Sequence, residues 1–177
     1  MTVLGISGSL RNGSHNTRLL RAAAELLPPG AELDVFDRLG EIPPFDEDSE
    51  HAPPPAVVAL KDAIAAADAV LIATPEYNHS IPGVLKNALD WVSRPIAKNP
   101  MRGKPALVVG ASTGMFGAVW AQAETRKVLG ALGARVIDEE LPVAKAPDSL
   151  DDHELLARLA DLLRELVSFG ETLRRAA

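Results

Sequence analysis

Residues 7–16 combine hydroxyl groups, glycines and one arginine directly before an expected helix. A phosphate group is held well by backbone N–H donors at a helix start, by hydroxyls and by a guanidinium group. Arg11 supplies the guanidinium group. The polar side chains are those of Ser9, Ser14 and Asn16. Serine and asparagine are also preferred helix caps, so an ordinary capped turn is the alternative; the arginine and the glycines favour a phosphate site.

The same segment lacks the residues that two other nucleotide-binding loops require. Gly8 and Gly13 have the spacing of a P-loop, but Ser14-His15 stands where that loop needs a lysine and a hydroxyl residue. NTP hydrolysis is therefore not expected. The glycines do not form G-x-G-x-x-G either, so the dinucleotide fingerprint is missing. Asp37, near the end of the second expected strand, is interpreted as a solvated residue and not as a ribose ligand.

A second polar segment, residues 74–83, lies between a fully apolar run and a helix that begins after a proline. Glu76 and Asn78 carry groups that bind the polar edge of a heterocycle, and Tyr77 carries a ring that stacks. A rigid turn between two prolines explains this segment equally well by itself. Glu76 and His79 lack a third ligand at suitable spacing, so no metal site is expected.

The third segment, residues 110–117, contains three glycines and two hydroxyl residues after another apolar run. Glycines allow the backbone to approach a ligand closely. Alone, this segment has low specificity. The prediction of a binding site rests on all three segments opening on the same edge of one sheet.

Apolar runs alternate with helical patterns along the whole chain, which indicates strands alternating with helices. The expected strands are residues 3–6, 33–36, 69–73, 105–109 and 134–137. The expected helices are residues 16–27, 57–67, 83–92, 118–132 and 151–173. Residues 38–55 contain five prolines and an acidic stretch, so an irregular surface segment is expected there.

Strands that are apolar throughout indicate a parallel sheet covered on both faces. Five such strands fit a three-layer, flavodoxin-like α/β fold with strand order 2-1-3-4-5. The chain reverses direction beside strand one in this order, which places a ligand between the first and third strand–helix loops. Residues 1–177 are expected to form a single domain, because no composition break divides them. The leucine seam of the last helix is interpreted as packing on the sheet and not as a coiled coil.

The composition excludes several classes of protein. The net charge of −6 provides no basic stripe for a nucleic-acid backbone. The chain has no cysteine, which removes disulfides, thiolate metal sites and cysteine nucleophiles, and with them phosphatases of similar topology. No signal-peptide pattern and no membrane-length apolar run is present in the sequence. A cytoplasmic protein without nucleic-acid or membrane partners is expected.

Two of these segments together resemble the NADPH-dependent FMN reductase family, flavodoxin-like proteins that include quinone, chromate and azo-dye reductases. The resemblance rests on GSLRNGSHN at residues 8–16 and on PEYNHSIPGVLKNALDW at residues 75–91, and it extends over nearly the whole chain. The acidic IPPFDED at residues 42–48 also resembles the long loop before the second helix of the family.

The resemblance implies an FMN site. The residues implied to hold the phosphate are Ser9, Arg11, Ser14, His15 and Asn16. Those implied to line the isoalloxazine ring, largely through backbone groups, are Pro75, Glu76, Tyr77 and Asn78, with Ser112 and Gly114 approaching it from the third segment. The flavin carries the reaction, so no catalytic acid or base is expected from the protein, and Tyr77 is a positioning candidate only.

The resemblance further implies hydride transfer from NADPH or NADH to FMN, followed by reduction of a small-molecule acceptor such as free flavin, a quinone, an azo compound or chromate. It also implies a homodimer or a homotetramer. The alternative is a non-enzymatic, flavodoxin-type electron carrier. Aromatic residues make up only 4% of the chain, which disfavours the two aromatic walls around the flavin of such a carrier.

The sequence departs from the family in the third segment. Relatives often continue Gly-Gly-x-Arg, whereas this chain continues Gly117-Ala118-Val119-Trp120. Because this arginine is missing, the contact that it makes across the tetramer or beside the nicotinamide is not expected here. Trp120 is expected at a subunit interface or, more commonly for a tryptophan, as a buried helix residue. The positions on the preceding helix expected to be structural or interfacial are Lys86, Asn87, Asp90 and Trp91.

Overall fold

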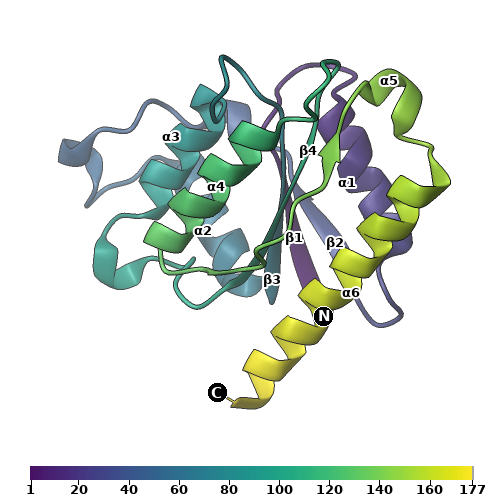
Figure 1. The fold of residues 1–177 in the computed structure, drawn as a ribbon. Helices are drawn as coiled ribbons and strands as arrows, with labels where there is room; N and C mark the ends of the chain where they lie inside the picture. Colours follow the sequence, from purple (N-terminus) through teal and green to yellow (C-terminus); the bar gives the residue numbers. More distant parts are fainter. Residues whose placement is uncertain (177) are drawn as a thin grey trace.

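The computed structural model describes residues 1–176 as a parallel sheet between two layers of helices (Figure 1). The strands are β1 (Thr2–Ser7), β2 (Glu32–Phe36), β3 (Ala69–Thr74), β4 (Pro105–Ala111), β5 (Arg135–Val136) and β6 (Pro142–Val143). Their order is β2-β1-β3-β4-β5, and β6 pairs with β4. The predicted order of the flavodoxin-like fold is therefore confirmed.

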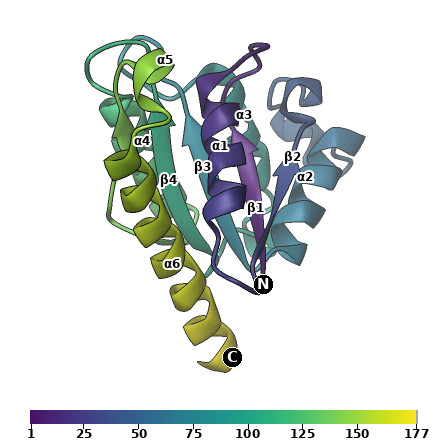
Figure 2. The same ribbon diagram turned by 90° about the vertical axis from the view of Figure 1, so that its right-hand side faces the viewer.

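Helices cover both faces of this sheet, as Figure 2 shows. They are α1 (His15–Leu26), α2 (Pro55–Ala66), α3 (Gly83–Val92), α4 (Val119–Ala131), α5 (Ala146–Ser149) and α6 (His153–Ala176), with short 3-10 turns η1 (Leu39–Glu41), η2 (Glu47–Ser49) and η3 (Ile96–Lys98). Residues of α2, α3 and α4 share one hydrophobic core with one side of the sheet. Residues of α1 and α6 form the second core on the other side.

The two central strands, β3 and β4, are buried at every residue. Successive side chains of a strand point to opposite faces. Val70 and Ile72 accordingly pack in the core with α2, α3 and α4, whereas Leu71 and Ala73 pack with α1 and α6. Burial on both faces is the reason that these strands are apolar throughout and show no alternation.

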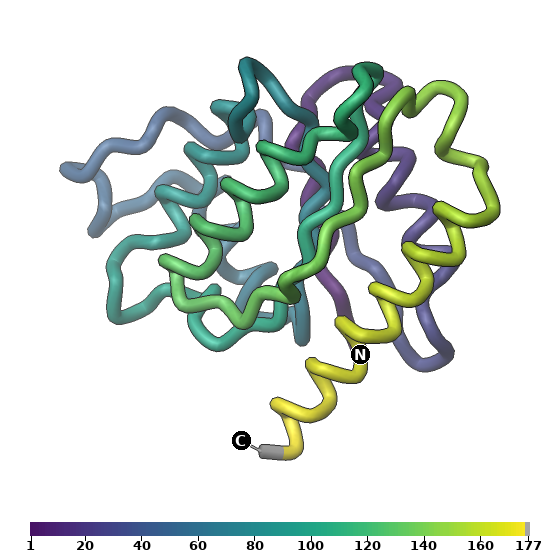
Figure 3. Tube along the Cα trace, viewed as in Figure 1, coloured from purple at the N-terminus to yellow at the C-terminus, as the bar shows by residue number. Residues whose placement is uncertain are grey.

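The leucine seam of α6 packs against the sheet and α1. Leu159, Leu162, Leu163 and Leu166 are buried in the second core, so the expected helix-on-sheet packing is confirmed. The last turns of α6 run past the amino ends of the strands, near the N-terminus of the chain (Figure 3).

Two elements between residues 138 and 150 were not expected from the sequence. Strand β6 pairs with the carboxyl end of β4, with Gly110 opposite Pro142 and Ala111 opposite Val143. Helix α5 follows directly. Elements of two and four residues are too short to show a periodicity, which is why the pattern of apolar residues did not reveal them.

Residues 37–54 run irregularly beside α3, and two side chains of α3 hold them. Asn87 Oδ1 accepts a hydrogen bond from the Phe45 N–H group (2.7 Å), and Asn87 Nδ2 donates to the Pro43 carbonyl (2.9 Å). Trp91 Nε1 donates to the same carbonyl (2.9 Å), and its ring meets Phe45 edge-on at 5.0 Å between centroids. Asn87 and Trp91 are therefore structural, one of the two roles expected for them.

Replacing Asn87 should destabilise the protein. Asn87→Ala leaves the Phe45 N–H group and part of the hydrogen bonding of Pro43 unsatisfied, so the free energy of unfolding should fall by about 1–3 kcal/mol. Lys86→Ala on the same helix is the matched control, because Lys86 Nζ forms only an exposed ion pair with Asp90 (2.7 Å); its loss should cost less than about 1 kcal/mol. Urea unfolding measures both, and equal losses would contradict the structural role of Asn87.

Candidate ligand-binding site

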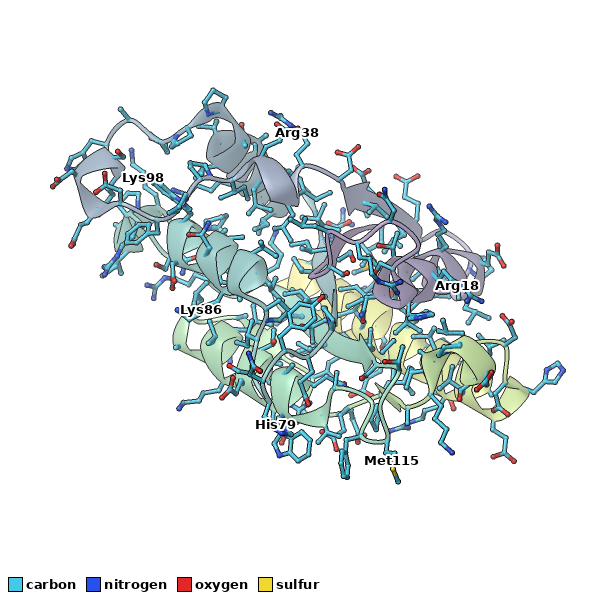
Figure 4. All side chains as sticks on the ribbon, turned by 90° about the horizontal axis from the view of Figure 1, so that it is seen from above. Arg18, Arg38, His79, Lys86, Lys98 and Met115 are labelled. Atoms are coloured by element: carbon cyan, nitrogen blue, oxygen red, sulfur yellow. The ribbon has the colours of Figure 1, made fainter. Side chains whose placement is uncertain are left out.

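The candidate site lies at the carboxyl edge of the sheet, where the chain leaves β1, β3 and β4. Figure 4 looks down on this edge. The loops after these strands enclose a pocket of about 150 Å³. Its lining residues are Ser9, Arg11, Ser14, His15, Asn16, Pro75, Glu76, Tyr77, Ala111, Ser112 and Thr113. The prediction that the loops after three different strands meet at one edge of the sheet is confirmed.

Nine of the eleven residues predicted for the site line this pocket. Asn78 and Gly114 do not line it, and Ala111 and Thr113 line it without having been predicted. Larger surface hollows, of 380 to 510 Å³, occur elsewhere, and none of the eleven predicted residues lines them in the described part of the chain. Convergent polar groups identify a binding site better than volume does.

The start of α1 forms one wall of the pocket. Ser14 caps this helix, and its Oγ accepts a hydrogen bond from the Thr17 N–H group (3.3 Å), as a capped turn requires. The N–H groups of His15 and Asn16, in the first turn, have no partner inside the helix. The positive end of the helix dipole is therefore directed toward the pocket. The capped turn and the anion site are compatible here, because the cap uses the side chain of Ser14 and leaves these N–H groups free of intrahelical bonds.

His15 carries the clearest sign of a missing ligand atom. Its Nδ1 is buried and has no hydrogen-bond partner among residues 1–176. Desolvation by burial lowers the pKa of His15, and the charges of Arg11 and Arg18 lower it further. A buried polar atom without a partner, close to two guanidinium groups, indicates a place for an anionic oxygen.

Asn16 links the first loop to β4. Its Nδ2 donates to the Ala111 carbonyl (3.0 Å), and its Oδ1 accepts from the Ala111 N–H group (2.9 Å). The side chain is almost fully buried. These bonds use one of the two N–H donors of the amide, so the predicted phosphate contact of Asn16 stays a prediction. The side chain also positions the first loop against β4.

Glu76 is committed to α4 in a similar way. Its Oε2 accepts hydrogen bonds from the N–H groups of Trp120 (3.0 Å) and Ala121 (3.1 Å), in the first turn of that helix. A carboxylate at this position also interacts favourably with the helix dipole. Both bonds end on Oε2, and the predicted contact of Glu76 with the edge of a bound ring stays a prediction.

Residues 77–80 form a tight hairpin turn. The Tyr77 N–H group donates to the Ser80 carbonyl (3.3 Å), and the Ser80 N–H group donates to the Tyr77 carbonyl (3.1 Å). Asn78 and His79, at the tip, have φ angles of 53° and 59°, the left-handed conformation that two-residue hairpin turns require. Asn78 thus sets the shape of the turn instead of lining the pocket.

A second carboxylate holds this turn, and it was not predicted from the sequence. Glu124 Oε2 accepts hydrogen bonds from Ser80 Oγ (2.5 Å) and from the Ile81 N–H group (3.3 Å). Glu124 lies on α4, 44 residues from Ser80. A contact at that separation has no local pattern, so only the tertiary structure reveals it.

The third loop is supported from behind by residues 143–146. The Ser112 N–H group donates to the Val143 carbonyl (3.0 Å), and the Ala146 N–H group donates to the Ser112 carbonyl (3.0 Å). A Cβ atom on Gly117 would lie 2.4 Å from the carbonyl carbon of Pro142. The close approach that was expected of the glycines toward a ligand is, at Gly117, an approach to β6.

Trp120 is 38% exposed, so the interpretation of this residue as a buried helix position is wrong.

Within residues 1–176, no group of three or more His, Asp or Glu side chains is arranged to hold a metal ion. In the same part of the chain, no helix is both long enough and apolar enough to cross a membrane.

The chain is similar in sequence to a known protein family and to several of its relatives. The model of the NADPH-dependent FMN reductase family matches residues 1–148. An NAD(P)H-dependent FMN reductase of Pseudomonas aeruginosa is 46% identical over 167 residues, which cover 93% of this chain and 88% of the relative. A quinone reductase of Escherichia coli is 36% identical over 182 aligned residues, with 99% and 96% of the two chains covered.

A solved structure shows the same fold. The FerB flavoenzyme NAD(P)H:(acceptor) oxidoreductase of Paracoccus denitrificans superimposes with a TM-score of 0.85 at 35% identity, with 97% of each chain covered. The match of the family model over most of the chain, and relatives of this identity over nearly its whole length, decide the family. This chain belongs to the NADPH-dependent FMN reductase family.

Proposed function

We propose that the chain binds FMN in the pocket at the carboxyl edge of the sheet and transfers electrons from NAD(P)H to a quinone or a similar small acceptor. Its family makes it an oxidoreductase enzyme that works with FMN and NAD(P)H. The observation that carries the assignment of the pocket is the buried, unpartnered Nδ1 of His15 beside Arg11 and the start of α1. A phosphate would supply the oxygen atoms that these donors lack.

The residues present fit the phosphate of FMN. The guanidinium group of Arg11 can form charge-assisted hydrogen bonds with a phosphate. The backbone N–H groups at the start of α1 add further hydrogen-bond donors, and they are uncharged. Ser9 and His15 would complete the set, and Asn16 would keep the first loop at a fixed distance from β4 through Ala111.

The ring of FMN would lie toward Pro75, Tyr77 and Ser112, on the other side of the pocket. Bound FMN would supply the redox chemistry, in which a hydride from NAD(P)H enters the ring system and two electrons pass on to the acceptor. A quinone gains two electrons and two protons; one proton derives from the hydride and the other from solvent. The residues of this chain would bind the FMN, orient its ring and shield it from solvent, and we assign no catalytic acid or base among them.

An enzyme is favoured over a flavodoxin-type electron carrier by the walls of the pocket. Of the described residues that line it, Tyr77 alone is a phenylalanine, tyrosine or tryptophan. A single aromatic wall leaves one face of a bound ring accessible to a second substrate. The relative from Escherichia coli is named a quinone reductase, which supports a quinone as the acceptor.

Anaerobic mixing of the FMN-loaded protein with NADPH tests the proposal directly. The visible absorption of the flavin should bleach rapidly and return when a quinone is added, because the acceptor takes the electrons. NADH is tested in parallel. Firm FMN binding without bleaching by either nucleotide would instead support the electron carrier, and failure to bind FMN would contradict the assignment of the pocket.

Removal of the pocket guanidinium should weaken FMN binding. Arg11→Ala should raise the Kd for FMN by roughly tenfold to a hundredfold, because a charge-assisted hydrogen bond contributes about 1.5–3 kcal/mol. Arg21→Ala is the matched control, because it removes the same charge from an exposed position of α1 that does not line the pocket. Fluorescence quenching of FMN measures both Kd values. Equal weakening in the two variants would show that only overall charge matters.

The titration of His15 should report the phosphate. In the free protein, the pKa of His15 should lie below its usual value of 6.5, because burial and the two arginines disfavour the charged ring. Stability linked to this residue is therefore present above pH 6.5 and is lost as the pH falls through the lowered pKa. A phosphate dianion at Nδ1 favours the charged ring, so FMN should raise the pKa.

NMR titration of the imidazole resonances, with and without FMN, measures this shift. His15→Gln identifies the resonance by its loss, and the other histidines serve as internal references. An unchanged pKa of His15 on saturation with FMN would contradict a contact between Nδ1 and the phosphate.

A further inference from the structure

An exposed aromatic cluster stands beside the pocket. The rings of His79 and Trp120 meet edge-to-face with centroids 4.5 Å apart, and those of Phe116 and Trp120 meet at 5.0 Å. Trp120 is 38% exposed, Phe116 58% and Met115 75%. Figure 4 shows His79 and Met115 projecting from the same edge of the molecule. We call His79, Met115, Phe116 and Trp120 the aromatic platform.

Glu76 holds the platform in place. His79 has a φ angle of 59°, the ordinary left-handed conformation of a two-residue hairpin turn. The Glu76 carboxylate accepts a hydrogen bond from the Trp120 N–H group (3.0 Å), and its Oε1 lies 3.7 Å from His79 Nδ1. Glu76 therefore lies between the turn that carries His79 and the helix that carries Trp120.

The same residue connects the platform to the pocket. Glu76 lines the pocket and caps the helix that carries Trp120. Tyr77 also lines the pocket and is 54% exposed. Pocket and platform therefore share one rigid segment. The backbone of Trp120 is one hydrogen bond away from a residue that lines the pocket.

The chemistry of the platform selects among acceptors. Its ring faces and edges, with the polarisable sulfur of Met115, suit a planar aromatic or quinonoid ring system. Its neighbouring charges are the carboxylates of Glu76 and Glu124, which already accept hydrogen bonds from the protein. An oxyanion such as chromate would find no lysine or arginine among the four residues of the platform.

We propose that the aromatic platform is the acceptor-binding surface of this enzyme, and that Trp120 selects neutral, planar acceptors of two or more fused rings. This inference rests on the proposed function. Trp120 acts on binding of the acceptor and has no part in binding FMN. It should therefore affect KM for planar acceptors more than kcat.

Trp120→Leu tests the proposal, because leucine keeps an apolar side chain and removes the ring. The ratio of kcat/KM for a naphthoquinone to kcat/KM for ferricyanide, a charged and non-planar acceptor, should fall by about fivefold to tenfold, mainly through KM. Trp120→Phe should restore most of the ratio. Val58→Ala on α2, where Val58 is 40% exposed, is the control and should leave the ratio unchanged.

Several outcomes would overturn the proposal. An unchanged ratio in Trp120→Leu would do so, whether kcat/KM stays the same for both acceptors or falls equally for both. A smaller molecular mass of the variant in light scattering, with parallel losses, would assign the platform to contact with a second copy of the chain. Bleaching of the flavin by NADPH is measured on the unmodified protein first. If that bleaching fails, the proposed function fails, whereas normal bleaching with an unchanged ratio rejects only the platform.

Discussion

The all-parallel pairing of β1, β3 and β4 is the constraint on which the candidate site depends. Parallel strands end at the same edge of a sheet, so the loops that follow them are brought together even though 60 or more residues separate the first from the second and third. Parallel pairing in turn requires helices on both faces. The two hydrophobic cores on either side of the sheet therefore create the binding edge without containing any of its polar groups.

Topology brings the loops to one edge, but side-chain hydrogen bonds set their spacing. Asn16 links the first loop to Ala111 at the end of β4. Glu76 links the second loop to the start of α4. Each of these two side chains makes two hydrogen bonds with backbone groups, which would otherwise lack a partner near the pocket. These hydrogen bonds hold the loops around the pocket in fixed positions. Fixed loops suit a site that must orient a bound cofactor.

Family resemblance and local geometry describe different parts of this molecule. The segments shared with the family, residues 8–16 and 75–91, build the pocket and tether the long loop through Asn87 and Trp91. The departure from the family falls at Trp120, which stands next to the pocket and is exposed. This departure places an exposed indole ring next to a residue that lines the pocket.

The sequence alone determined the fold class, the strand order and the helix boundaries to within a few residues, because burial on both faces leaves continuous apolar runs. It also predicted which loops meet at one edge of the sheet, and nine of the eleven residues predicted for the site line one pocket there. Only the tertiary structure decided what each polar side chain does. Polarity predicted ligand contacts for Asn16 and Glu76, and the tertiary structure adds that both side chains bind backbone groups of distant segments.

The same limit explains the remaining differences. Strand β6, the contact of Glu124 with Ser80 and the edge-to-face contact of His79 with Trp120 all join residues far apart in the sequence or elements of two residues. Local periodicity carries no information about such pairs. They exist because the sheet edge places particular backbone and side-chain atoms within hydrogen-bonding or van der Waals distance, which is a property of the folded chain.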